Sequence, residues 1–407
     1  MKVLITNSVP LNGGDEALLR ATIGGMKLVF SDIEVQVLCT NVPLCRKHLP
    51  DLKLDADFEY NLSNESLGFW EKLKARIRIR LQMHLKIKPY SFLSLLFAHP
   101  KERKAVGFYK KADLILSSAG GYIHDFYPIE NRLKGFELAI ELKKNLVIFA
   151  QSVGPFWKDQ SKERVKNVFD RIPIILLREH LSEKHLKNIG VSLSNIFVTA
   201  DAAFIYRKLN PELFVTKIGK VESIAMCFRK WPIQDIESEN IISKAVELCI
   251  HILRDQQRSI TFISTCQGID GYTDDSLLAK KIIARLPLDI RTKCFIDSKR
   301  YSPTNLIKQY SKFDAYVGMR LHGSILAMLG GTPAMGIAYE DKTKGVYSQL
   351  GLEKFHVNYD DEIALWKRTF DIFVENISNI NSKLPAALDN IANLAEKNIE
   401  LIKTRLK

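Results

Sequence analysis

The chain has 407 residues, of which 46% are hydrophobic and 26% charged, and its formal net charge is +13. This composition is that of a globular protein, and the length exceeds one domain, so two domains are expected. No apolar run approaches the length of a bilayer span, and the amino terminus resembles a first strand more than a signal peptide. We therefore expect a cytoplasmic protein.

Cysteine usage predicts a reduced protein without a metal centre. Six cysteines are scattered along the chain with no C-x-x-C pair and no clustered histidines. This distribution argues against both a disulfide framework and a zinc site, and no motif requires a metal or a redox cofactor. The positive charge predicts attraction to anions, which include charged metabolites, anionic lipid and nucleic acid.

Short apolar segments alternate with helical patterns along the chain, which is typical of doubly wound parallel sheets. The first series of predicted strands covers residues 2–6, 34–39, 113–117, 145–151, 174–177 and 196–198. The second series covers residues 223–228, 259–264, 293–296, 314–317 and 334–338. We therefore predict two Rossmann-like sheets of the α/β class that face one another across a cleft.

A break between the two series predicts the domain boundary. Residues 208–221 contain Pro and Gly and carry no strong helix or strand pattern. We predict an amino-terminal domain at 1–208 and a second domain at 222–360. Residues 361–407 have a polar helical pattern, so we expect carboxyl-terminal helices that pack across both lobes.

A basic stretch occupies residues 69–104 and carries ten Lys and Arg against two Glu. Its residue types favour helix, although its apolar residues alternate as in a strand. One interpretation is a basic, apolar surface that rests on the cytoplasmic membrane leaflet. The alternative is a solvated basic helix packed on its own domain, and the charge pattern alone does not choose between them.

In the first domain, small and polar residues follow several predicted strands. The segment after the first strand places Asp15 near a helix start behind two glycines, although a glycine turn with a capping carboxylate would look the same. The loop at 117–125 contains Gly120 and Gly121, which permit a ligand to lie on the main chain, and ends at Asp125. Asp125 could accept a hydrogen bond or a proton from a hydroxyl.

One arginine of the first domain also follows a buried strand. Arg178 ends the segment IPIILLR, which places it at the expected edge of the cleft. A surface salt bridge with a nearby glutamate is the alternative. Asp201 follows the next predicted strand, and the same two interpretations apply to it: a position at the edge of the cleft or a surface salt bridge.

The second domain adds cations at the ends of three predicted strands. They are Arg229, Arg320 with His322, and Lys342. The carboxyl ends of strands in one doubly wound sheet lie along one edge, so these side chains should converge. Burying several like charges without an anion would be costly. The pattern therefore predicts a small-anion site beside a proton-transfer group, with the amides of Gly323, Ser324 and Ile325 opening a helix there.

The chain resembles the polysaccharide pyruvyl transferases over roughly residues 12 to 352. The segments that carry the resemblance are NGGDEALL, AGGYIHD, QSVGP, LREHLS, TADAAF, the arginine of FRKWP, GMRLHGSILAMLGGTPAMGIAYEDK and YSQLGL. Two departures are evident. The family usually has a run of glycines where this chain has Ser118 and Ala119, and the basic stretch matches no family motif.

The resemblance implies a fold like that of the two-lobed GT-B glycosyltransferases and transfer of pyruvate from phosphoenolpyruvate to two sugar hydroxyls as a cyclic ketal. The sugar would belong to a bacterial polysaccharide, such as a capsule or exopolysaccharide, or to its undecaprenyl-diphosphate-linked precursor. It implies that Asp125, Arg178, Arg320 and His322 line the active site, with Lys342 and Arg229 nearby. We expect Arg320, Lys342 and Arg229 to hold the donor, His322 to transfer a proton and Asp125 to orient the acceptor hydroxyl.

Two other functions fit the same residues. A GT-B glycosyltransferase that uses a nucleotide sugar has the same architecture, because fold does not fix function. A non-catalytic protein that binds glycans or phosphate would also use the arginines. A nucleic-acid partner is disfavoured, because the charge is concentrated in one stretch without a recognised binding motif.

Overall fold

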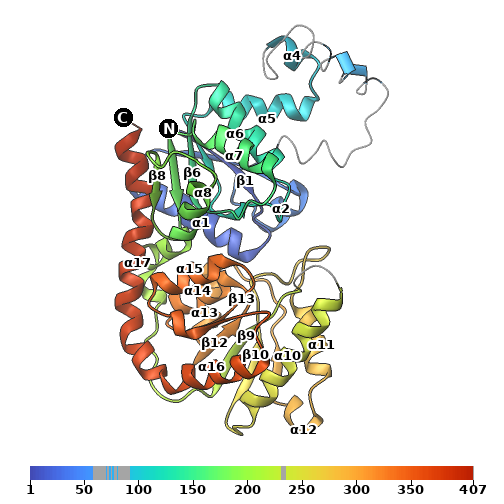
Figure 1. Ribbon diagram of the computed structural model, residues 1–407, viewed down its shortest axis with the longest axis vertical. Coiled ribbons are helices and arrows are strands. Elements are labelled where there is room, and N and C mark those ends of the chain that lie inside the picture. The colour runs from blue at the N-terminus through green and yellow to red at the C-terminus, as the bar shows by residue number, and fades with distance from the viewer. Residues whose placement is uncertain are drawn as a thin grey trace.

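The computed structural model describes residues 1–57, 92–230 and 235–406, with isolated positions between 70 and 80. Within these residues two parallel sheets lie one above the other, and the carboxyl-terminal helix runs along both (Figure 1). The predicted helix in the basic stretch falls largely outside the described residues. Apart from those isolated positions, only the end of that stretch is described, as α4 (Phe92–Leu96) followed by the start of α5 (Pro100–Lys111).

The first sheet is parallel in all its described pairs and has the strand order β3-β2-β1-β4-β6-β7-β8, with β5 paired to β6. Its strands are β1 (Lys2–Ser8), β2 (Glu34–Cys39), β3 (Leu54–Ala56), β4 (Leu114–Ser117), β5 (Gly120–Ile123), β6 (Asn145–Val153), β7 (Ile174–Leu177) and β8 (Ile196–Val198). The helices described with it, besides α4 and α5, are α1 (Gly13–Val29), α2 (Val42–His48), α6 (Glu130–Glu141), α7 (Asp159–Phe169) and α8 (His180–Asn188).

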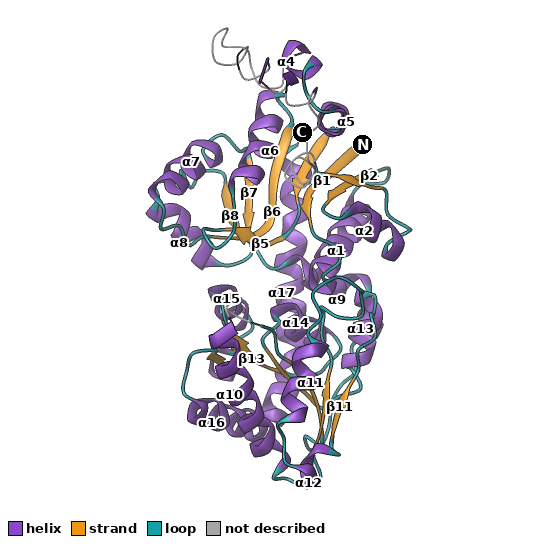
Figure 2. Ribbon diagram, turned by 90° about the vertical axis from the view of Figure 1, so that its right-hand side faces the viewer, coloured by secondary structure: helices purple, strands orange, loops and turns teal. Residues whose placement is uncertain are grey.

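The first sheet is buried on both faces because helices cover each side (Figure 2). Successive side chains of a strand point to opposite faces, and β1 follows this rule. Val3 and Ile5 belong to one apolar cluster, whereas Leu4 belongs to another. A run of apolar residues without polar alternation is what a doubly covered parallel strand requires.

The second sheet is also parallel and has the order β11-β10-β9-β12-β13-β14. Its strands are β9 (Ser223–Cys227), β10 (Ser259–Phe262), β11 (Cys294–Ile296), β12 (Ala315–Gly318), β13 (Ala334–Ala338) and β14 (His356–Asn358). Its helices are α10 (Asp235–Leu253), α11 (Ser276–Ala284), α12 (Leu288–Arg291), α13 (Pro303–Tyr310), α14 (Leu321–Leu329), α15 (Asp341–Gln349) and α16 (Ile363–Glu375), with the 3-10 turn η3 (Glu353–Phe355).

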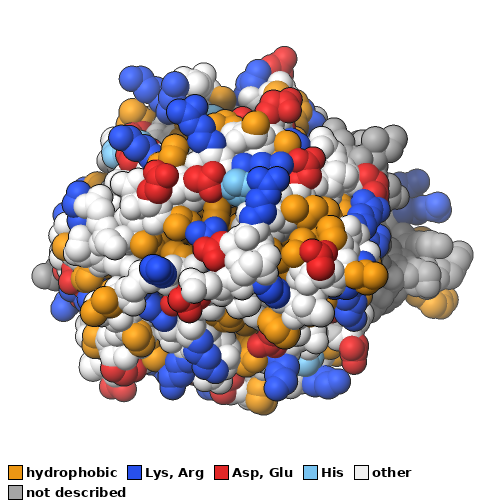
Figure 3. Space-filling model, turned by 90° about the horizontal axis from the view of Figure 1, so that it is seen from below, with side chains coloured by type: hydrophobic (Ala, Val, Ile, Leu, Met, Phe, Trp, Pro, Cys, Tyr) orange, Lys and Arg blue, Asp and Glu red, His pale blue; other side chains and the backbone are white. Residues whose placement is uncertain are grey.

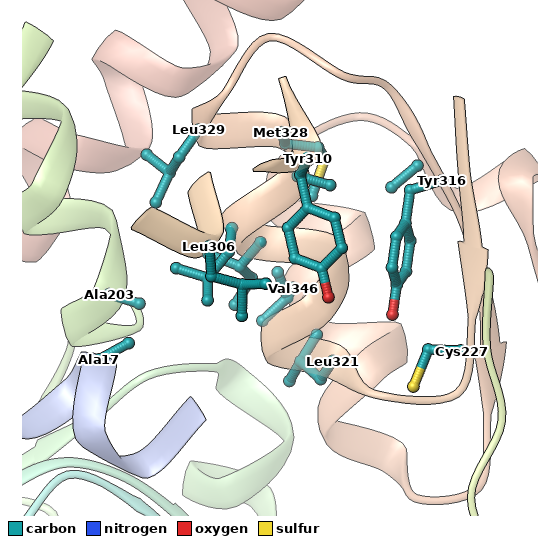
Figure 4. Close-up of a cluster of buried hydrophobic side chains, with 14 of the residues drawn as sticks. Ala17, Ala203, Cys227, Leu306, Tyr310, Tyr316, Leu321, Met328, Leu329 and Val346 are labelled. Atoms are coloured by element: carbon teal, nitrogen blue, oxygen red, sulfur yellow. The ribbon is translucent and has the colours of Figure 1, made fainter. Parts of the chain in front are cut away.

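The connection between the sheets consists of η1 (Ala202–Ile205), α9 (Tyr206–Leu209) and η2 (Pro211–Leu213), followed by an irregular segment. The apolar core continues through this junction. Ala17 of α1, Ala203 of η1 and Leu329 of α14 lie in one buried cluster (Figure 4). The two lobes are therefore joined by a shared core behind the site.

Helix α17 (Ile377–Arg405) packs against elements of both lobes, among them α1, α14 and α16. Its Asn398 is fully buried, accepts a hydrogen bond from Thr199 at 2.6 Å and donates one to the carbonyl of Ala200 at 3.1 Å. None of the described helices is long and apolar enough to cross a membrane. On the face seen from below, acidic and basic side chains are interspersed (Figure 3).

Candidate functional site

A cavity of about 240 Å³, hereafter the central cavity, lies where strand ends of the two sheets meet. Strand order reverses between β1 and β4 in the first sheet and between β9 and β12 in the second. At such a point the connections leave in opposite directions, so a crevice opens beyond the carboxyl ends of the strands. Several lining residues come from these ends. In the first lobe Asn12 and Asp15 follow β1, and Gly121 lies in β5, which comes after β4. In the second lobe Arg229 follows β9 and Arg320 follows β12.

The lining of the central cavity is strongly cationic. Its described residues include one acid, Asp15, against five permanently charged bases, namely Arg132, Arg178, Arg229, Arg320 and Lys342. His322 also lines it. The structure therefore brings together most of the residues predicted from strand ends, and the imbalance of charge favours an anionic ligand.

His322 lies in the first turn of α14. The backbone of Arg320, the residue that precedes the helix, is extended, and Leu321 is the first helical residue. Its Nε2 is 3.4 Å from Oδ2 of Asp201 and forms no hydrogen bond to the described residues. The imidazole also packs against α1, because a Cβ at Gly14 would lie 2.7 Å from Nδ1 of His322. Gly14 thus permits an element of the first lobe to contact the histidine of the second.

Arg178 has no exposed surface. Its Nη1 donates to Oδ2 of Asp201 at 2.6 Å, and its Nε donates to Oγ of Ser152 at 2.6 Å. Its Nη2 has no hydrogen-bond partner among the described residues. A buried charged donor without a partner is costly, so this atom is suited to an anion bound in the cavity. The salt bridge with a nearby glutamate considered from the sequence does form, between Nε of Arg178 and Oε2 of Glu179 at 3.5 Å, but it is buried and not on the surface.

Asp201 joins Arg178 to His322. Burial alone would raise the pKa of this carboxyl, but the positive charges of His322 and Arg178 outweigh burial and hold its pKa below the usual range. Asp201 therefore stays ionised near neutral pH. An ionised carboxylate beside an imidazole orients the ring.

The other cations are also held in place by partners. Arg320 is buried and donates to both oxygens of Asp275, from Nε at 2.7 Å and from Nη2 at 2.8 Å. Arg229 donates to the hydroxyl of Tyr339 at 2.7 Å. Such pairing fixes the orientation of each guanidinium before a ligand arrives.

Lys342 lies 5.3 Å from the centroid of the Tyr339 ring and pairs with Glu340. Burial alone would lower the pKa of Lys342, but Tyr339 and Glu340 raise it above its ordinary value. Lys342 is therefore a cation at neutral pH. It contributes an ammonium group to a cavity that otherwise holds guanidinium groups.

The pKa of Asp15 is shifted toward the neutral form of its carboxyl group, unlike that of Asp201. Burial raises its pKa, although the positive charges of His322 and Lys342 act in the opposite direction. The neighbouring Asn12 caps α1 by accepting a hydrogen bond from the amide of Gly14 at 3.0 Å. Asp15 is thus more readily protonated than an exposed aspartate and faces the cavity, which suits a group that carries a proton.

Asp125 is not among the residues that line the central cavity. Its Oδ2 accepts hydrogen bonds from the amides of Trp157 and Lys158, at 2.7 Å and 2.8 Å. These bonds tie the loop after β5 to the segment before α7. The placement gives Asp125 a structural role and does not support the predicted contact with the acceptor hydroxyl.

Three other predicted residues also lie outside the lining of the cavity. Gly120 belongs to β5, and a Cβ at Gly323 would lie 2.1 Å from the hydroxyl of Tyr316, so Gly323 is needed for packing. The amide of Ser324 bonds to the carbonyl of Arg320 within the helix. The helix begins at Leu321, two residues earlier than predicted, so Gly323 still lies in its first turn, whereas the amide of Ser324 is used inside the helix.

Sequence reasoning missed several residues of the site. Arg132 lies inside α6 and reaches the cavity over the ring of Tyr122, with 4.1 Å between its guanidinium and the ring centroid. Asp275, the partner of Arg320, comes from a loop before α11. Neither follows a strand, and no local pattern marks either of them.

Two facing Rossmann-like sheets with a helical tail define a GT-B-like protein, and its site combines a cationic lining with an imidazole. A model of the polysaccharide pyruvyl transferase family matches residues 12–341. The chain belongs to that family. It is 25% identical over 368 residues to the amylovoran biosynthesis protein AmsJ of Erwinia amylovora, a match that covers 86% of each sequence.

Solved structures support the fold. The Anabaena protein Alr3699/HepE, crystallised with UDP, superposes with a TM-score of 0.60 at 13% identity, covering 99% of this chain and 100% of that one. The UDP-GlcNAc 2-epimerase of Neisseria meningitidis, bound to UDP-GlcNAc, gives a TM-score of 0.57 at 12% identity and covers 100% of both chains. At these identities the likeness concerns architecture alone.

Proposed function

We propose that this chain transfers the pyruvyl group of phosphoenolpyruvate onto two hydroxyls of one sugar residue, forming a cyclic ketal and releasing phosphate. The observation that carries the proposal is the central cavity, where five cations and His322 face a single acid. Phosphoenolpyruvate places a carboxylate and a phosphate on three carbons. Several guanidinium groups and one ammonium group match both anions.

The donor is held by Arg320, Lys342, Arg229 and Arg178. Bidentate pairing of Arg320 with Asp275 leaves its Nη1 for the ligand, and Arg178 offers the unpartnered Nη2. Arg132 adds a fifth positive charge at the cavity wall. Family membership and a polysaccharide-related relative support a sugar as the second substrate.

The chemistry requires proton movement at two places. A proton added to the methylene carbon of the donor makes C2 electrophilic, and a sugar hydroxyl attacks C2 as it loses its proton. The bond from C2 to the phosphate oxygen then breaks, and a second hydroxyl attacks C2 and loses its proton. Of the two protons released by the hydroxyls, one balances that gained by the methylene carbon, and the phosphate or solvent takes the other.

His322 and Asp15 are the groups placed to move these protons. His322 lies beside ionised Asp201, and its ring can donate to the methylene carbon and accept again from a hydroxyl. Asp15 lines the same cavity, and its raised pKa allows it to carry a second proton. No step requires a redox cofactor.

The acceptor is a sugar of a polysaccharide or of its precursor. If the basic stretch at 69–104 contacts anionic lipid, an undecaprenyl-diphosphate-linked saccharide at the cytoplasmic leaflet is the favoured form. Binding of the purified chain to vesicles with and without anionic lipid tests this part separately. Equal binding to both vesicle types would contradict it.

The central experiment measures donor binding and product together. Phosphoenolpyruvate should raise the melting temperature, and incubation with free and lipid-linked sugars should release phosphate and give a product with the mass of the ketal. A rise with UDP and none with phosphoenolpyruvate would indicate a nucleotide-sugar enzyme instead. Donor binding without phosphate release from any sugar would favour a non-catalytic binding protein.

A further inference from the structure

A second cavity of about 170 Å³, hereafter the side pocket, adjoins the central cavity. Gly121, Tyr339 and Lys342 line both. A Cβ at Gly121 would lie 2.9 Å from Nη2 of Arg178 and 3.5 Å from Cδ of Lys342. The wall between the two spaces is therefore thin at Gly121, and a ligand in the side pocket lies next to the bound donor.

The side pocket differs from the central cavity in charge. Three carboxylates line it, from Glu179, Glu340 and Asp341, against one permanent cation, Lys342. Glu179 is satisfied by the hydroxyls of Ser152 and Ser182. An acidic lining disfavours a second anion such as a phosphate.

Glu340 offers an acceptor without a partner. Its Oε2 pairs with Lys342, whereas its Oε1 is buried and receives no hydrogen bond from the described residues. Burial alone would raise the pKa of Glu340, but Lys342 holds it below the usual value, so this carboxylate is ionised. A buried ionised oxygen without a donor favours a ligand that brings a hydroxyl.

The histidines of the side pocket do not restore positive charge. Burial lowers the pKa of His124 to about 4. Burial also lowers the pKa of His185. At neutral pH both rings are therefore uncharged. His124 uses both ring nitrogens within its own loop, at the carbonyl of Gly121 and the amide of Phe126.

An exposed aromatic surface borders the side pocket. Phe126 lines it with 54% of its surface exposed, and Trp157, 49% exposed, packs on Phe126 with ring centroids 4.8 Å apart. Two adjacent exposed aromatic rings give the mouth of this polar pocket an apolar surface that the C–H face of a sugar can cover. Asp125, through its bonds to the amides of Trp157 and Lys158, fixes Trp157 next to Phe126.

We propose that the side pocket binds the acceptor as a neutral saccharide of at least two sugars, an inference that rests on the function proposed above. The C–H face of the reacting sugar packs on Phe126, and its hydroxyls donate to Glu340 and Asp341. Trp157 supports the next sugar. This division assigns the anionic donor to the cationic cavity and the uncharged acceptor to the acidic, aromatic pocket.

Phe126→Ala tests the proposal, because the ring is exposed and its loss spares the core. Phe295 is the matched control, with the same 54% exposure on β11 of the second sheet. Neutral galacto- and manno-oligosaccharides of two or more sugars serve as probes. Saturation-transfer NMR with these probes should show binding to the wild type and to Phe295→Ala, and about tenfold weaker binding to Phe126→Ala, equivalent to about 1.4 kcal/mol.

The readouts separate this inference from the function on which it rests. In Phe126→Ala the acceptor KM should rise while the melting shift caused by phosphoenolpyruvate stays unchanged. Absence of saccharide binding to the wild type, or equal binding by Phe126→Ala and Phe295→Ala, would overturn the inference even if the donor binds. If saccharides bind in a way that depends on Phe126 but no phosphate is released, the proposed transferase function is wrong, whereas the inference that the side pocket binds saccharides is retained.

Discussion

At the scale of single residues, the site depends on a chain of three side chains from both lobes. Arg178 and Asp201 follow strands of the first sheet, and His322 follows β12 of the second. Asp201 contacts the other two, at 2.6 Å and 3.4 Å. One buried carboxylate therefore links the arginine to which we assign anion binding with the histidine to which we assign proton transfer.

Replacing His322 with alanine should lower kcat by about 10²- to 10⁴-fold, the usual contribution of a general acid or base. The ring lies at the cavity wall, so the melting temperature should change little. Phosphate release in the presence of donor and acceptor measures the effect. His180→Ala is the control, because that ring is 80% exposed and pairs with the neighbouring Glu183 on the surface of α8. Full turnover in His322→Ala would exclude the assigned role.

The titration of Asp15 predicts a sign for the pH dependence of stability. Because burial raises its pKa above 3.8, the folded state binds this proton more tightly than the unfolded state does. Its contribution is fully present below the unfolded pKa and is lost as pH rises through the folded pKa. The stability of the wild type relative to Asp15→Asn should therefore fall as pH rises from below 3.8 through the raised folded pKa.

Urea unfolding of both proteins across that range measures the difference. Asp51 is a control of opposite sign, because the hydrogen bond from Arg20 lowers its pKa. The wild type should lose stability relative to Asp51→Asn as pH falls through the lowered folded pKa. A wild-type advantage over Asp15→Asn that grows with pH would contradict the burial argument.

At the scale of elements, the contact between α1 and α14 decides where His322 lies. Gly14 in the first turn of α1 leaves room for the imidazole, since a Cβ there would lie 2.7 Å from Nδ1. Gly13 beside it donates its amide to the carbonyl of Thr265 in the second lobe at 2.8 Å. The glycine pair after β1 therefore sets the distance between the lobes at the site.

Gly14→Ala should lower kcat by about tenfold or more, because the histidine must shift out of line with the donor. The helix itself favours alanine over glycine, so stability should not decide the outcome. Gly107→Ala in α5 is the control, because a Cβ there meets nothing within 4 Å. That variant should keep full turnover and gain about 0.5 to 1 kcal/mol of unfolding free energy. Equal turnover in the two variants would show that Gly14 does not position the ring.

At the scale of the whole molecule, α17 and the shared core hold the two sheets in one arrangement. Leu388 on the buried side of α17 belongs to the cluster that also contains residues of both sheets. The cavity between the lobes then has a defined shape before substrate binds, which lowers the cost of ordering the cations.

Leu388→Ala should cost about 2 to 5 kcal/mol of unfolding free energy, because it leaves a cavity in that core. Both lobes should lose stability together, and donor binding should weaken with them. Thermal unfolding followed by circular dichroism measures the effect, with exposed Lys383→Ala as the control at less than about 0.5 kcal/mol. Loss confined to one lobe would contradict a shared core.

Several features were predictable from local sequence. Strands β2, β7, β8 and β13 have the predicted bounds. For β7, β8 and β13 the signal is a continuous apolar run between turn residues, as needed in sheets covered on both faces, whereas β2 alternates polar and apolar residues before its buried end. Strands β3 and β14 were missed because each is short and includes polar residues, and β5 was missed because its two glycines resemble a loop. The predicted clustering of cations followed from the rule that parallel strands end at one edge.

The sequence by itself determined the two-sheet α/β architecture, the family and most of the cationic residues of the cavity. The reason is that hydrophobic periodicity and strand ends can be recognised from short segments of sequence. Only the tertiary structure decided which side chains share a cavity. In the structure Asp125 accepts hydrogen bonds between two loops and does not line the central cavity. Arg132 lines the cavity and Asp275 pairs with Arg320, although neither residue follows a strand. Such contacts depend on the distance in space between side chains from elements that are far apart in the sequence. Local sequence patterns do not predict that distance.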